Sequence, residues 1–429
     1  MLDPTVDPRY PRILVIAPNT FVRSEGGGNL LSDLFQGWPA SKLASIYTNQ
    51  VGDPDKAICG HAYQLYPRPS RKPMGWVRRS WDYARGVNES LDGAVSMRMT
   101  NSLLAWLRTY DPQVVYSFLG RLSLSRLTNT IVDLLGVPLV IHIMDDYVSD
   151  WPVCGIPERN IFPVAQILNR LNRREFLKAA ERARLRLSLS DAMTETYRLR
   201  YGLEFQAVRA GAELPGSSAP IDPHPTGGSS TDPVRIFYGG SVLRNTNHRA
   251  IVEVAEAVRR LRDRAVNIEL VLACSARSRA LLSELDDRQH VRFVSMVPHQ
   301  QVPHLLRQQD ILLLPFNFDP GSVRFIRYSW PSKIPEYLFS GVPILIYGPS
   351  VAAFVQSAQT KGWALAVDRQ DATALEHAIE QLASDKGLRR EIAAVAGDLG
   401  RHEHDIRRIR SDFQHALREV AAATGAAFD

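Results

Sequence analysis

The sequence predicts an α/β protein with two Rossmann-like domains, each built on a parallel sheet. The chain has 429 residues, whereas single hydrophobic cores rarely grow beyond about 250 to 300 residues. Short apolar runs alternate with longer amphipathic segments, which is the pattern of parallel βαβ units. This alternation occurs in two series, separated by a stretch of different composition, so we expect two domains.

The first series predicts four buried strands in the N-terminal half of the chain. They lie at residues 13–17, 114–118, 138–143 and 185–190. Each is a short run rich in apolar residues and of the length expected for a strand. Helical patterns lie between them, for example at residues 96–110.

Residues 210–233 separate the two series. They are rich in Gly, Pro, Ser and Asp and contain almost no large apolar side chain, as expected of a flexible interdomain connection. We therefore predict an N-terminal domain at 1–213, a linker at 214–233 and a C-terminal domain at 234–404.

The second series predicts another parallel sheet, followed by a helical tail. The tail begins near Ala372 and includes a charged amphipathic helix at about 402–421. The expected strands are residues 234–238, 268–272, 291–294, 310–314 and 342–347.

Composition excludes several classes of protein. Hydrophobic residues make up 45% and charged residues 22% of the chain, which excludes a disordered or collagen-like protein. No run of about 20 apolar residues predicts a membrane span, and the N-terminus, with Asp3 and Asp7, does not resemble a signal peptide. We expect a cytoplasmic protein. Because no two of its three cysteines form a CxxC pair, neither a disulfide framework nor a zinc site is indicated.

Lys333 and Glu336 are the most informative pair in the chain. Spaced three apart, they share one face of a first helical turn, after Pro331 and Ser332 and before Gly341. Free amides and a partial positive charge at the helix start, together with the lysine, suit a phosphate, and the glutamate can accept hydrogen bonds from a ribose diol. The alternative is an ordinary helical ion pair.

This stretch resembles the donor-binding segment of retaining glycosyltransferases with the GT-B architecture, and within them family 4 (glycosyl transferases group 1). The resemblance implies two facing Rossmann-like domains with a donor cleft between them. It assigns the nucleotide ribose to Glu336 and the diphosphate to Lys333 and the helix start at Ser332. It further implies that no cofactor or metal is needed, and that a C-terminal helix at about 405–429 rejoins the N-terminal domain.

A glycine cluster after the first strand is a second candidate site. Gly26, Gly27 and Gly28 open a helix, where glycine permits close approach of a ligand to the backbone. Leu31 stands where a dinucleotide fingerprint needs its third glycine, which argues against an NAD enzyme. The resemblance places Gly27 and Gly28 near the donor phosphates or the acceptor, and a simple tight turn is the alternative.

His142 ends the strand at 138–143, at the edge of a parallel sheet where ligands bind. The resemblance places this histidine against the transferred sugar; the alternative is a core histidine satisfied by its neighbours. Asp145 and Asp146 follow it. Because they are adjacent rather than spaced, we do not interpret them as a metal site, and expect one of them to contact a sugar hydroxyl.

The loop after the first strand of the C-terminal domain contains Gly240, Ser241 and Arg244. The glycine allows close approach of a ligand, and the arginine can reach a diphosphate. This loop departs from the commonest family pattern, in which an arginine and a Lys-Gly pair follow the strand, because residues 245–248 read Asn-Thr-Asn-His. A solvated Arg244 is therefore an equal alternative.

Tyr328 marks a second departure from the family. Many family members have a glutamate at this position, eight residues before Glu336, in contact with the donor sugar. We expect Asp319, Gly321 or Ser322 in the same loop to substitute for it.

Val297 occupies the place where family members stack the nucleotide base. It lies between the strand at 291–294 and a helical segment at 301–308. The alternative is an ordinary βα loop.

Two basic segments suggest an anionic membrane surface as a partner. One runs from Arg68 to Trp81 and interleaves tryptophans with cations; the other recurs every four residues from Arg170 to Arg186 on an expected helix. A solvated basic face is the alternative. No nucleic-acid module accompanies the charge, so we expect no nucleic-acid partner.

The predicted function is transfer of a sugar from a nucleotide-diphosphate sugar to an acceptor hydroxyl. The resemblance implies a hexosyltransferase-like reaction with retention, in which Lys333, Arg244 and His142 act at the reacting centre. A glycan or lipid-linked acceptor is expected, in the assembly of glycans, envelope polysaccharide or glycolipid. Two alternatives remain: a non-catalytic nucleotide-sugar-binding or scaffold subunit, which Tyr328 favours, and a GT-B-type epimerase, disfavoured because no separate carboxylate series is present.

Overall fold

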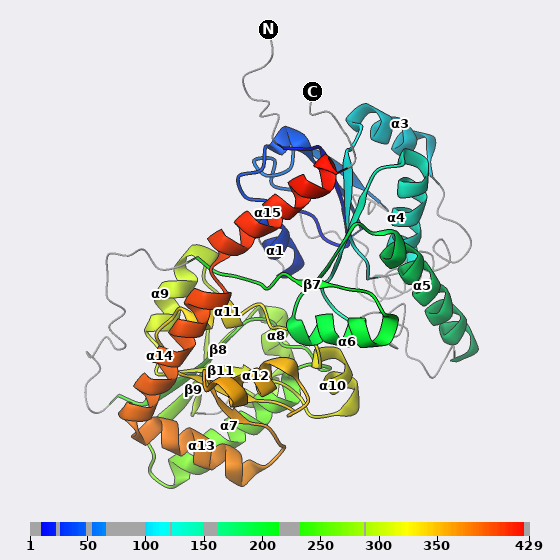
Figure 1. Cartoon of the computed structure of the whole chain (residues 1–429). Helices are drawn as coiled ribbons and strands as arrows, with labels where there is room; N and C mark the ends of the chain where they lie inside the picture. The colour runs from blue at the N-terminus through cyan, green and yellow to red at the C-terminus, as the bar shows by residue number, and fades with distance from the viewer. Residues whose placement is uncertain are drawn as a thin grey trace. The chain divides into compact units, whose positions relative to one another are not determined.

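The computed structural model consists of two compact units (Figure 1). The first contains Met1–Arg209 and Arg407–Asp429, and the second contains Ala210–Ile406. The structure describes residues 10–22, 26–48, 54–65, 99–120, 122–146, 148, 162–213, 232–286 and 289–423.

The first unit is built on a seven-stranded parallel sheet with the order β3-β2-β1-β4-β5-β6-β7. The four predicted strands are present, and three further strands at the sheet's two sides were not predicted. The strands are β1 (Ile13–Ala17), β2 (Leu43–Tyr47), β3 (His61–Gln64), β4 (Val114–Phe118), β5 (Leu139–Ile143), β6 (Leu185–Ser188) and β7 (Gln206–Ala207).

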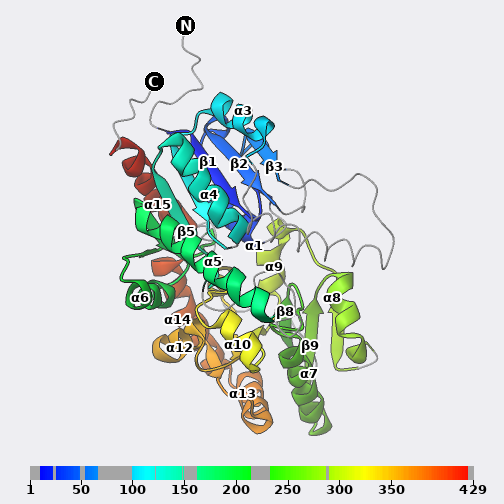
Figure 2. The same cartoon turned by 90° about the vertical axis from the view of Figure 1, so that its right-hand side faces the viewer.

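Helices cover this sheet, and α4 packs beside α5 on one face of it (Figure 2). The helices of the first unit are α1 (Gly26–Leu34), α3 (Asn101–Tyr110), α4 (Leu122–Leu135), α5 (Phe162–Arg182), α6 (Asp191–Tyr201) and α15 (Ile406–Ala422), with a 3-10 turn, η1, at Ala40–Lys42.

The C-terminal helix α15 packs beside α1. Phe413 meets Phe35 and Tyr116 edge to face, with ring centroids 5.2 and 5.5 Å apart. Gln414 donates hydrogen bonds to the Leu34 and Gln36 carbonyls, both at 3.0 Å. The apolar stripe of α15 is therefore buried against the N-terminal sheet, far from it in sequence.

The predicted helix at 402–421 is wrong at its start, because the structure divides this region into α14 (Lys386–Glu403) and α15. At the break, Ala212 pairs with Asp405 in a parallel bridge, and the His404 Nδ1 atom lies 2.7 Å from the Ala210 carbonyl. Gly211 fits between them only as glycine, since a Cβ would lie 2.9 Å from the His404 carbonyl oxygen. The helix breaks where its backbone pairs with the segment that contains Ala212.

The second unit has a six-stranded parallel sheet with the order β10-β9-β8-β11-β12-β13. The five predicted strands are present, and β13 is additional. Their bounds are β8 (Val234–Gly239), β9 (Ile268–Ala273), β10 (Val291–Val294), β11 (Ile311–Pro315), β12 (Ile344–Tyr347) and β13 (Leu365–Val367). The prediction of two α/β domains with parallel sheets is confirmed.

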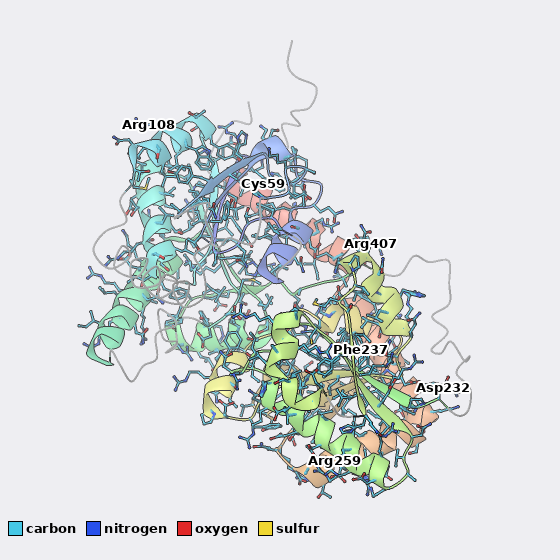
Figure 3. All side chains as sticks on the ribbon, turned by 180° about the vertical axis from the view of Figure 1, so that it is seen from behind. Cys59, Arg108, Asp232, Phe237, Arg259 and Arg407 are labelled. Atoms are coloured by element: carbon cyan, nitrogen blue, oxygen red, sulfur yellow. The ribbon has the colours of Figure 1, made fainter. Side chains whose placement is uncertain are left out.

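Side chains that alternate along the central strands fill two separate cores. On β8, Ile236 and Tyr238 join a core beneath α7 (His248–Asp263) and α13 (Ala372–Ser384). Phe237 joins a core beneath α11 (Ile334–Leu338), α12 (Ala353–Lys361) and α14. Figure 3 labels Phe237 within this sheet. The helices of the unit are α7 (His248–Asp263), α8 (Ala276–Leu281), α9 (Val302–Arg307), α10 (Pro320–Ile326), α11 (Ile334–Leu338), α12 (Ala353–Lys361), α13 (Ala372–Ser384) and α14, with 3-10 turns η3 (Ser283–Leu285) and η4 (His299–Gln301).

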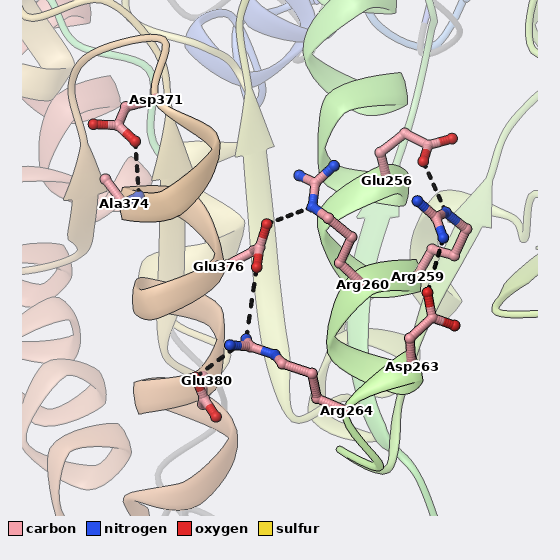
Figure 4. Close-up of polar contacts among 9 residues, drawn as sticks. All are labelled: Glu256, Arg259, Arg260, Asp263, Arg264, Asp371, Ala374, Glu376 and Glu380. Atoms are coloured by element: carbon pink, nitrogen blue, oxygen red, sulfur yellow. Dashed lines mark hydrogen bonds and ion pairs between the residues drawn. The ribbon is translucent and has the colours of Figure 1, made fainter.

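Ion pairs join α7 to α13 at the surface (Figure 4). Arg260 pairs with Glu376, and Arg264 lies 3.6 Å from Glu376 and 3.4 Å from Glu380. Exposed pairs of this kind each contribute about 0 to 1 kcal/mol, so the buried apolar contacts beneath them hold the two helices together.

Strand order reverses once in each sheet. β1 lies between β2 and β4, and β8 lies between β9 and β11. In open parallel sheets, ligands bind at the carboxyl ends of the strands beside such a switch point. The loops after β1 and β8 are therefore the first places to look for a site.

The cysteines that the structure describes are buried thiols. Cys59 and Cys274 are both free, and burial raises the pKa of Cys59 to about 12, which keeps it protonated. Cys154 lies outside the described residues. Among the residues described, no helix has both the length and the apolar character needed to cross a bilayer.

Candidate functional site

Buried side chains set the shape of the loop after β8. The Tyr238 hydroxyl donates a hydrogen bond to the Ser241 carbonyl at 2.5 Å and accepts one from Asn247 Nδ2 at 2.7 Å. The Asn247 Oδ1 atom accepts from the Leu243 amide at 2.9 Å. Gly240 has a φ of +137°, a conformation that favours glycine. These contacts therefore hold the loop in a fixed conformation.

Residues beyond β11 fix the other half of the same loop. Asn317 Nδ2 donates to the Arg244 carbonyl at 2.9 Å, and the Asn317 amide donates to the Thr246 carbonyl at 2.8 Å. The Ser322 hydroxyl lies 2.8 Å from the Asn245 carbonyl. The Asn-Thr-Asn sequence that departs from the family pattern is thus part of a hydrogen-bonded junction between two strands of the switch point.

Lys333 extends across this loop. Its Nζ atom lies 5.0 Å from the centre of the Tyr238 ring, within the range of a cation–π contact. A Cβ placed at Gly240 would lie 2.5 Å from the Lys333 Cε atom and 2.7 Å from Nζ. The structure therefore brings Lys333 and Gly240, 93 residues apart, into direct contact.

The helix that contains Glu336 is shorter than predicted. It spans Ile334–Leu338, with Lys333 as its N-cap residue and Ser332 exposed just before it. The Glu336 Oε1 atom lies 3.4 Å from the His299 Nδ1 atom. Glu336 thus stands in the first turn, as expected, and contacts the loop that follows β10.

The loop after β10 contains Val297, which is half-buried and precedes His299 at the start of η4. Because His299 meets Glu336, the loop proposed to face the base lies next to the residue proposed to hold the ribose. The role of Val297 itself stays a prediction.

Two of the three predicted sugar contacts after β11 have structural partners. The Asp319 Oδ1 atom caps α10 by accepting from the Ser322 amide at 3.0 Å. Burial raises the pKa of Asp319, but hydrogen bonds from Ser322 and from the backbone amides of Asp319 and Gly321 together outweigh this effect, so its pKa is lowered. Ser322 is fully buried. Gly321 is exposed, and its sugar contact stays a prediction.

Tyr328 and Arg244 lie beside this region. Tyr328 is half-buried, with the Arg327 guanidinium 5.8 Å from its ring centre. Arg244 and Ser241 are both exposed. The contact between Arg244 and a diphosphate stays a prediction, because the hydrogen bond from Asn317 fixes its carbonyl and not its guanidinium.

The glycine cluster of the first unit has a different geometry. Gly26, Gly27 and Gly28 form the first turn of α1. A Cβ on Gly28 would lie 2.2 Å from the Val22 carbonyl oxygen, and one on Gly27 would lie 3.0 Å from the Asn19 amide nitrogen. Packing of the chain on itself explains Gly28 without a ligand, so the roles of Gly27 and Gly28 toward a donor stay predictions.

His142 lies inside the first unit. It has no exposed surface, its Nδ1 atom is 2.7 Å from the Tyr116 hydroxyl, and Nε2 has no hydrogen-bond partner among the described residues. Burial lowers its pKa to about 3, so the ring is neutral at pH 7. This matches the core-histidine alternative at Nδ1, while contact with a sugar stays a prediction.

Asp146 contributes to the packing of α6. It accepts a hydrogen bond from the Tyr197 hydroxyl at 2.7 Å and lies 3.6 Å from Arg200. Asp145 next to it is half-buried. Within the described parts of the chain, no group of three or more His, Cys, Asp or Glu side chains could hold a metal ion. Independence from metal remains a prediction about the reaction.

Some side chains of the predicted basic stripe on α5 form ion pairs or hydrogen bonds, and others are exposed. Lys178 and Arg182 both pair with Asp133, at 2.8 and 2.7 Å. Arg186 donates to backbone carbonyls at the end of the helix. Arg170 and Arg174 are exposed. The segment from Arg68 to Trp81 lies outside the described residues.

Three residues of the second unit were not predicted as parts of the site: Tyr238, Asn247 and Asn317. Tyr238 reads in the sequence as one more apolar strand residue, and the asparagines read as loop residues. The available signal was that Asn247 and Asn317 each follow a predicted strand of the same sheet, where side chains from neighbouring loops meet.

Comparison with known proteins finds a family match within the second unit. Residues 233–385 match the family model described as glycosyl transferases group 1. A search of curated protein sequences gives no match.

Solved structures resemble the whole chain. Sucrose-phosphate synthase from Thermosynechococcus elongatus superposes with a TM-score of 0.64 at 13% identity, covering 96% of this chain and 100% of that one. Anabaena HepE, in complex with UDP and glucose, gives 0.61 at 13% identity over 95% and 99%. WaaG, a glycosyltransferase involved in lipopolysaccharide biosynthesis, gives 0.60 at 14% identity over 94% and 99%. At this level of identity the likeness establishes the fold.

The chain therefore has the two-domain GT-B fold, and residues 233–385 of its second unit match the family model of glycosyl transferases group 1.

Proposed function

We propose that the protein transfers a sugar from a nucleotide-diphosphate sugar to an acceptor hydroxyl, with retention of configuration. The observation that carries the proposal is the junction of Lys333, Gly240 and Tyr238 at the switch point of the second sheet. One cation and a glycine-containing backbone loop meet there at the start of α11, the helix that contains Glu336. These are the groups that a diphosphate and a ribose require.

Lys333 supplies positive charge to the leaving diphosphate. Its ammonium lies over the Tyr238 ring, so its position is fixed before the donor binds. A preorganised charge stabilises developing negative charge without the cost of reorganising water. Because Gly240 has no Cβ, the Lys333 side chain can lie against the loop, which puts its ammonium beside the backbone that a phosphate would approach.

Glu336 accepts hydrogen bonds from the ribose hydroxyls. Its contact with His299 holds the carboxylate beside the loop that follows β10. A base stacked near Val297 would then lie on the same side as the ribose. Because HepE was solved with UDP, uracil is the first base to test.

Retention, metal independence and the acceptor belong to this proposal as well. The leaving phosphate would assist the incoming hydroxyl on the same face of the sugar, since no carboxylate is assigned as nucleophile. WaaG, with its role in lipopolysaccharide biosynthesis, makes a glycan or lipid-linked acceptor in envelope polysaccharide or glycolipid assembly our first choice. Sugar phosphates are the next class to test, because a trehalose-phosphate synthase neighbour was solved with glucose-6-phosphate.

Thermal unfolding with a panel of nucleoside diphosphates and their sugars tests the donor site. A ligand at 100 times its Kd adds about 2.7 kcal/mol to the stability of the state it binds. We expect the nucleotides of one base to raise the Tm of the wild type. They should not raise the Tm of Lys333→Ala or Glu336→Ala. Lys361→Ala is the matched control, because that exposed lysine pairs with Glu403 on the same unit and should leave the response unchanged.

Nucleotide release tests catalysis separately. With the donor so identified, free nucleotide should form only when an acceptor is added. Binding without release under any acceptor would favour the non-catalytic alternative, for which Tyr328 is the supporting residue. Isomerisation of the donor sugar without acceptor would identify an epimerase.

A further inference from the structure

One side of α5 carries several charged side chains. Six side chains at helical spacing line an open hollow of about 440 Å³ there: Arg170, Arg173, Arg174, Leu177, Lys178 and Glu181. The opposite side of the helix is core, where Phe176 is 1% exposed and Ala179 and Ala180 are 0% exposed. The hollow therefore faces away from the sheet.

Half of the lining contributes little net charge. Lys178 shares Asp133 with Arg182. Glu181 supplies the acidic group of the hollow. The positive charge is therefore concentrated in the N-terminal half of the hollow, at Arg170, Arg173 and Arg174.

These three arginines form what we call the α5 basic patch. All three are exposed. The Arg173 guanidinium lies 5.8 Å from the centre of the Tyr201 ring at the end of α6, which limits its motion. Ile167, one turn before Arg170, is 55% exposed. An apolar side chain and three guanidinium groups thus share one open surface.

We propose that the α5 basic patch binds the phosphate groups of anionic phospholipid headgroups. Guanidinium groups pair with phosphate through two parallel hydrogen bonds. The negative potential of an anionic leaflet attracts clustered basic residues, and an exposed isoleucine beside them can enter the headgroup region. The patch shares no residue with the donor site, so its function is tested independently of glycosyl transfer.

The expected effect follows from the charge. Each basic residue near an anionic surface contributes about 1 kcal/mol, which is about fivefold in the partition coefficient. Loss of all three arginines should therefore weaken binding by about 100-fold. The attraction should also fall steeply with salt, because the screening length shortens from about 8 Å at physiological ionic strength to about 3 Å at 1 M.

The test is sedimentation of the full chain with vesicles of phosphatidylglycerol and phosphatidylcholine, and with phosphatidylcholine alone. The test variant is Arg170→Gln, Arg173→Gln, Arg174→Gln. The control is Arg259→Gln, Arg264→Gln, Arg292→Gln, which removes the same net charge from ion-paired arginines of the second unit. Circular dichroism and the Tm verify that both variants fold.

Binding of the wild type and the control to the anionic vesicles, with about 100-fold weaker binding of the test variant, supports the proposal. It is overturned if the wild type does not bind, if the test variant binds like the wild type, or if the control loses binding equally. Loss of binding on addition of a few millimolar inorganic phosphate, at constant ionic strength, would also overturn it by identifying a site for a soluble phosphate. If the test variant unfolds, Arg170→Gln and Arg174→Gln singly should each weaken binding about fivefold.

Discussion

The two units place glycines at equivalent points, after the strand beside the switch point, for different physical reasons. In the first unit Gly28 is required by backbone, because the Val22 carbonyl oxygen occupies the place of a Cβ. In the second unit Gly240 is required by its positive φ and by the side chain of Lys333. A glycine cluster in the sequence therefore does not by itself identify a ligand site; the atoms that exclude its Cβ do.

Gly240→Ala should have the largest effect on activity. The new Cβ would strain the backbone by about 1 to 3 kcal/mol and push Lys333 away from its position over Tyr238. Because loss of one preorganised charge-stabilising group costs about 100- to 1,000-fold in rate, we expect kcat/KM for the donor to fall at least 100-fold.

Gly362→Ala is the matched control for that variant. Its φ of +74° is also positive, but no atom lies within 4 Å of its Cβ position. It should lose about as much stability through strain while keeping its kcat/KM. Equal loss of activity in both variants would attribute the effect of Gly240→Ala to strain alone.

Gly28→Ala should instead cost stability. Forcing a Cβ against the Val22 carbonyl should lower the free energy of unfolding of the first unit by about 1 to 3 kcal/mol. Gly27→Ala should cost less, since its neighbour is the movable Asn19 side chain at 3.0 Å. Denaturant titration measures both, and a donor Kd changed by Gly28→Ala would contradict the packing explanation.

His142 should make the first unit sensitive to acid. Its pKa is about 3 in the fold against 6.5 for the free side chain, so the unfolded chain binds the proton first. Stability is complete above about pH 6.5 and decreases as the pH falls toward 3, by about 2 kcal/mol at pH 5. His142→Gln should remove this component, which unfolding of both proteins at pH 7 and pH 5 will measure.

The same acid sensitivity in His142→Gln as in the wild type would show that the histidine is not held neutral by burial. Tyr116 keeps its hydroxyl in both proteins, so the comparison isolates the ring that titrates.

Variants of Tyr238 should have the smallest effects, and they separate the contribution of its hydroxyl from that of its ring. Tyr238→Phe keeps the ring beneath Lys333 and breaks the bonds to Ser241 and Asn247, whereas Tyr238→Leu removes the ring as well. Since a cation–π contact contributes about 0.5 to 2 kcal/mol, Tyr238→Leu should have a kcat/KM about 2- to 30-fold below that of Tyr238→Phe. Equal values would show that the ring does not position Lys333.

The central strands of the fold could be predicted because their sequences are short runs rich in large apolar residues. β1 and β4 are fully buried along their length, and such runs can be recognised without long-range information. β3 is an edge strand whose first residues are exposed, and β7 has two residues, so neither has a pattern of its own. β2 is fully buried, but with Ala44 and Ser45 it has fewer large apolar side chains than β1 or β4.

The site could be predicted only in part. Lys333 and Glu336 lie in one short segment, and their spacing is visible in the sequence. The contact between Lys333 and Gly240 depends on the order of β8, β11 and β12 in the sheet, which local patterns do not determine. Likewise, Ser322 reads as an available loop hydroxyl, but it is buried at the junction with Asn245.

The most direct test of the site is a calorimetric titration of the identified nucleoside diphosphate, its monophosphate and its 2′-deoxy analogue. It is made with the wild type, Lys333→Ala and Glu336→Ala. We expect Lys333→Ala to bind the diphosphate and the monophosphate almost equally while still preferring ribose over 2′-deoxyribose. Glu336→Ala should show the reverse pattern. If both variants keep both preferences of the wild type, the diphosphate and the ribose are bound elsewhere and the assignment of this site is wrong.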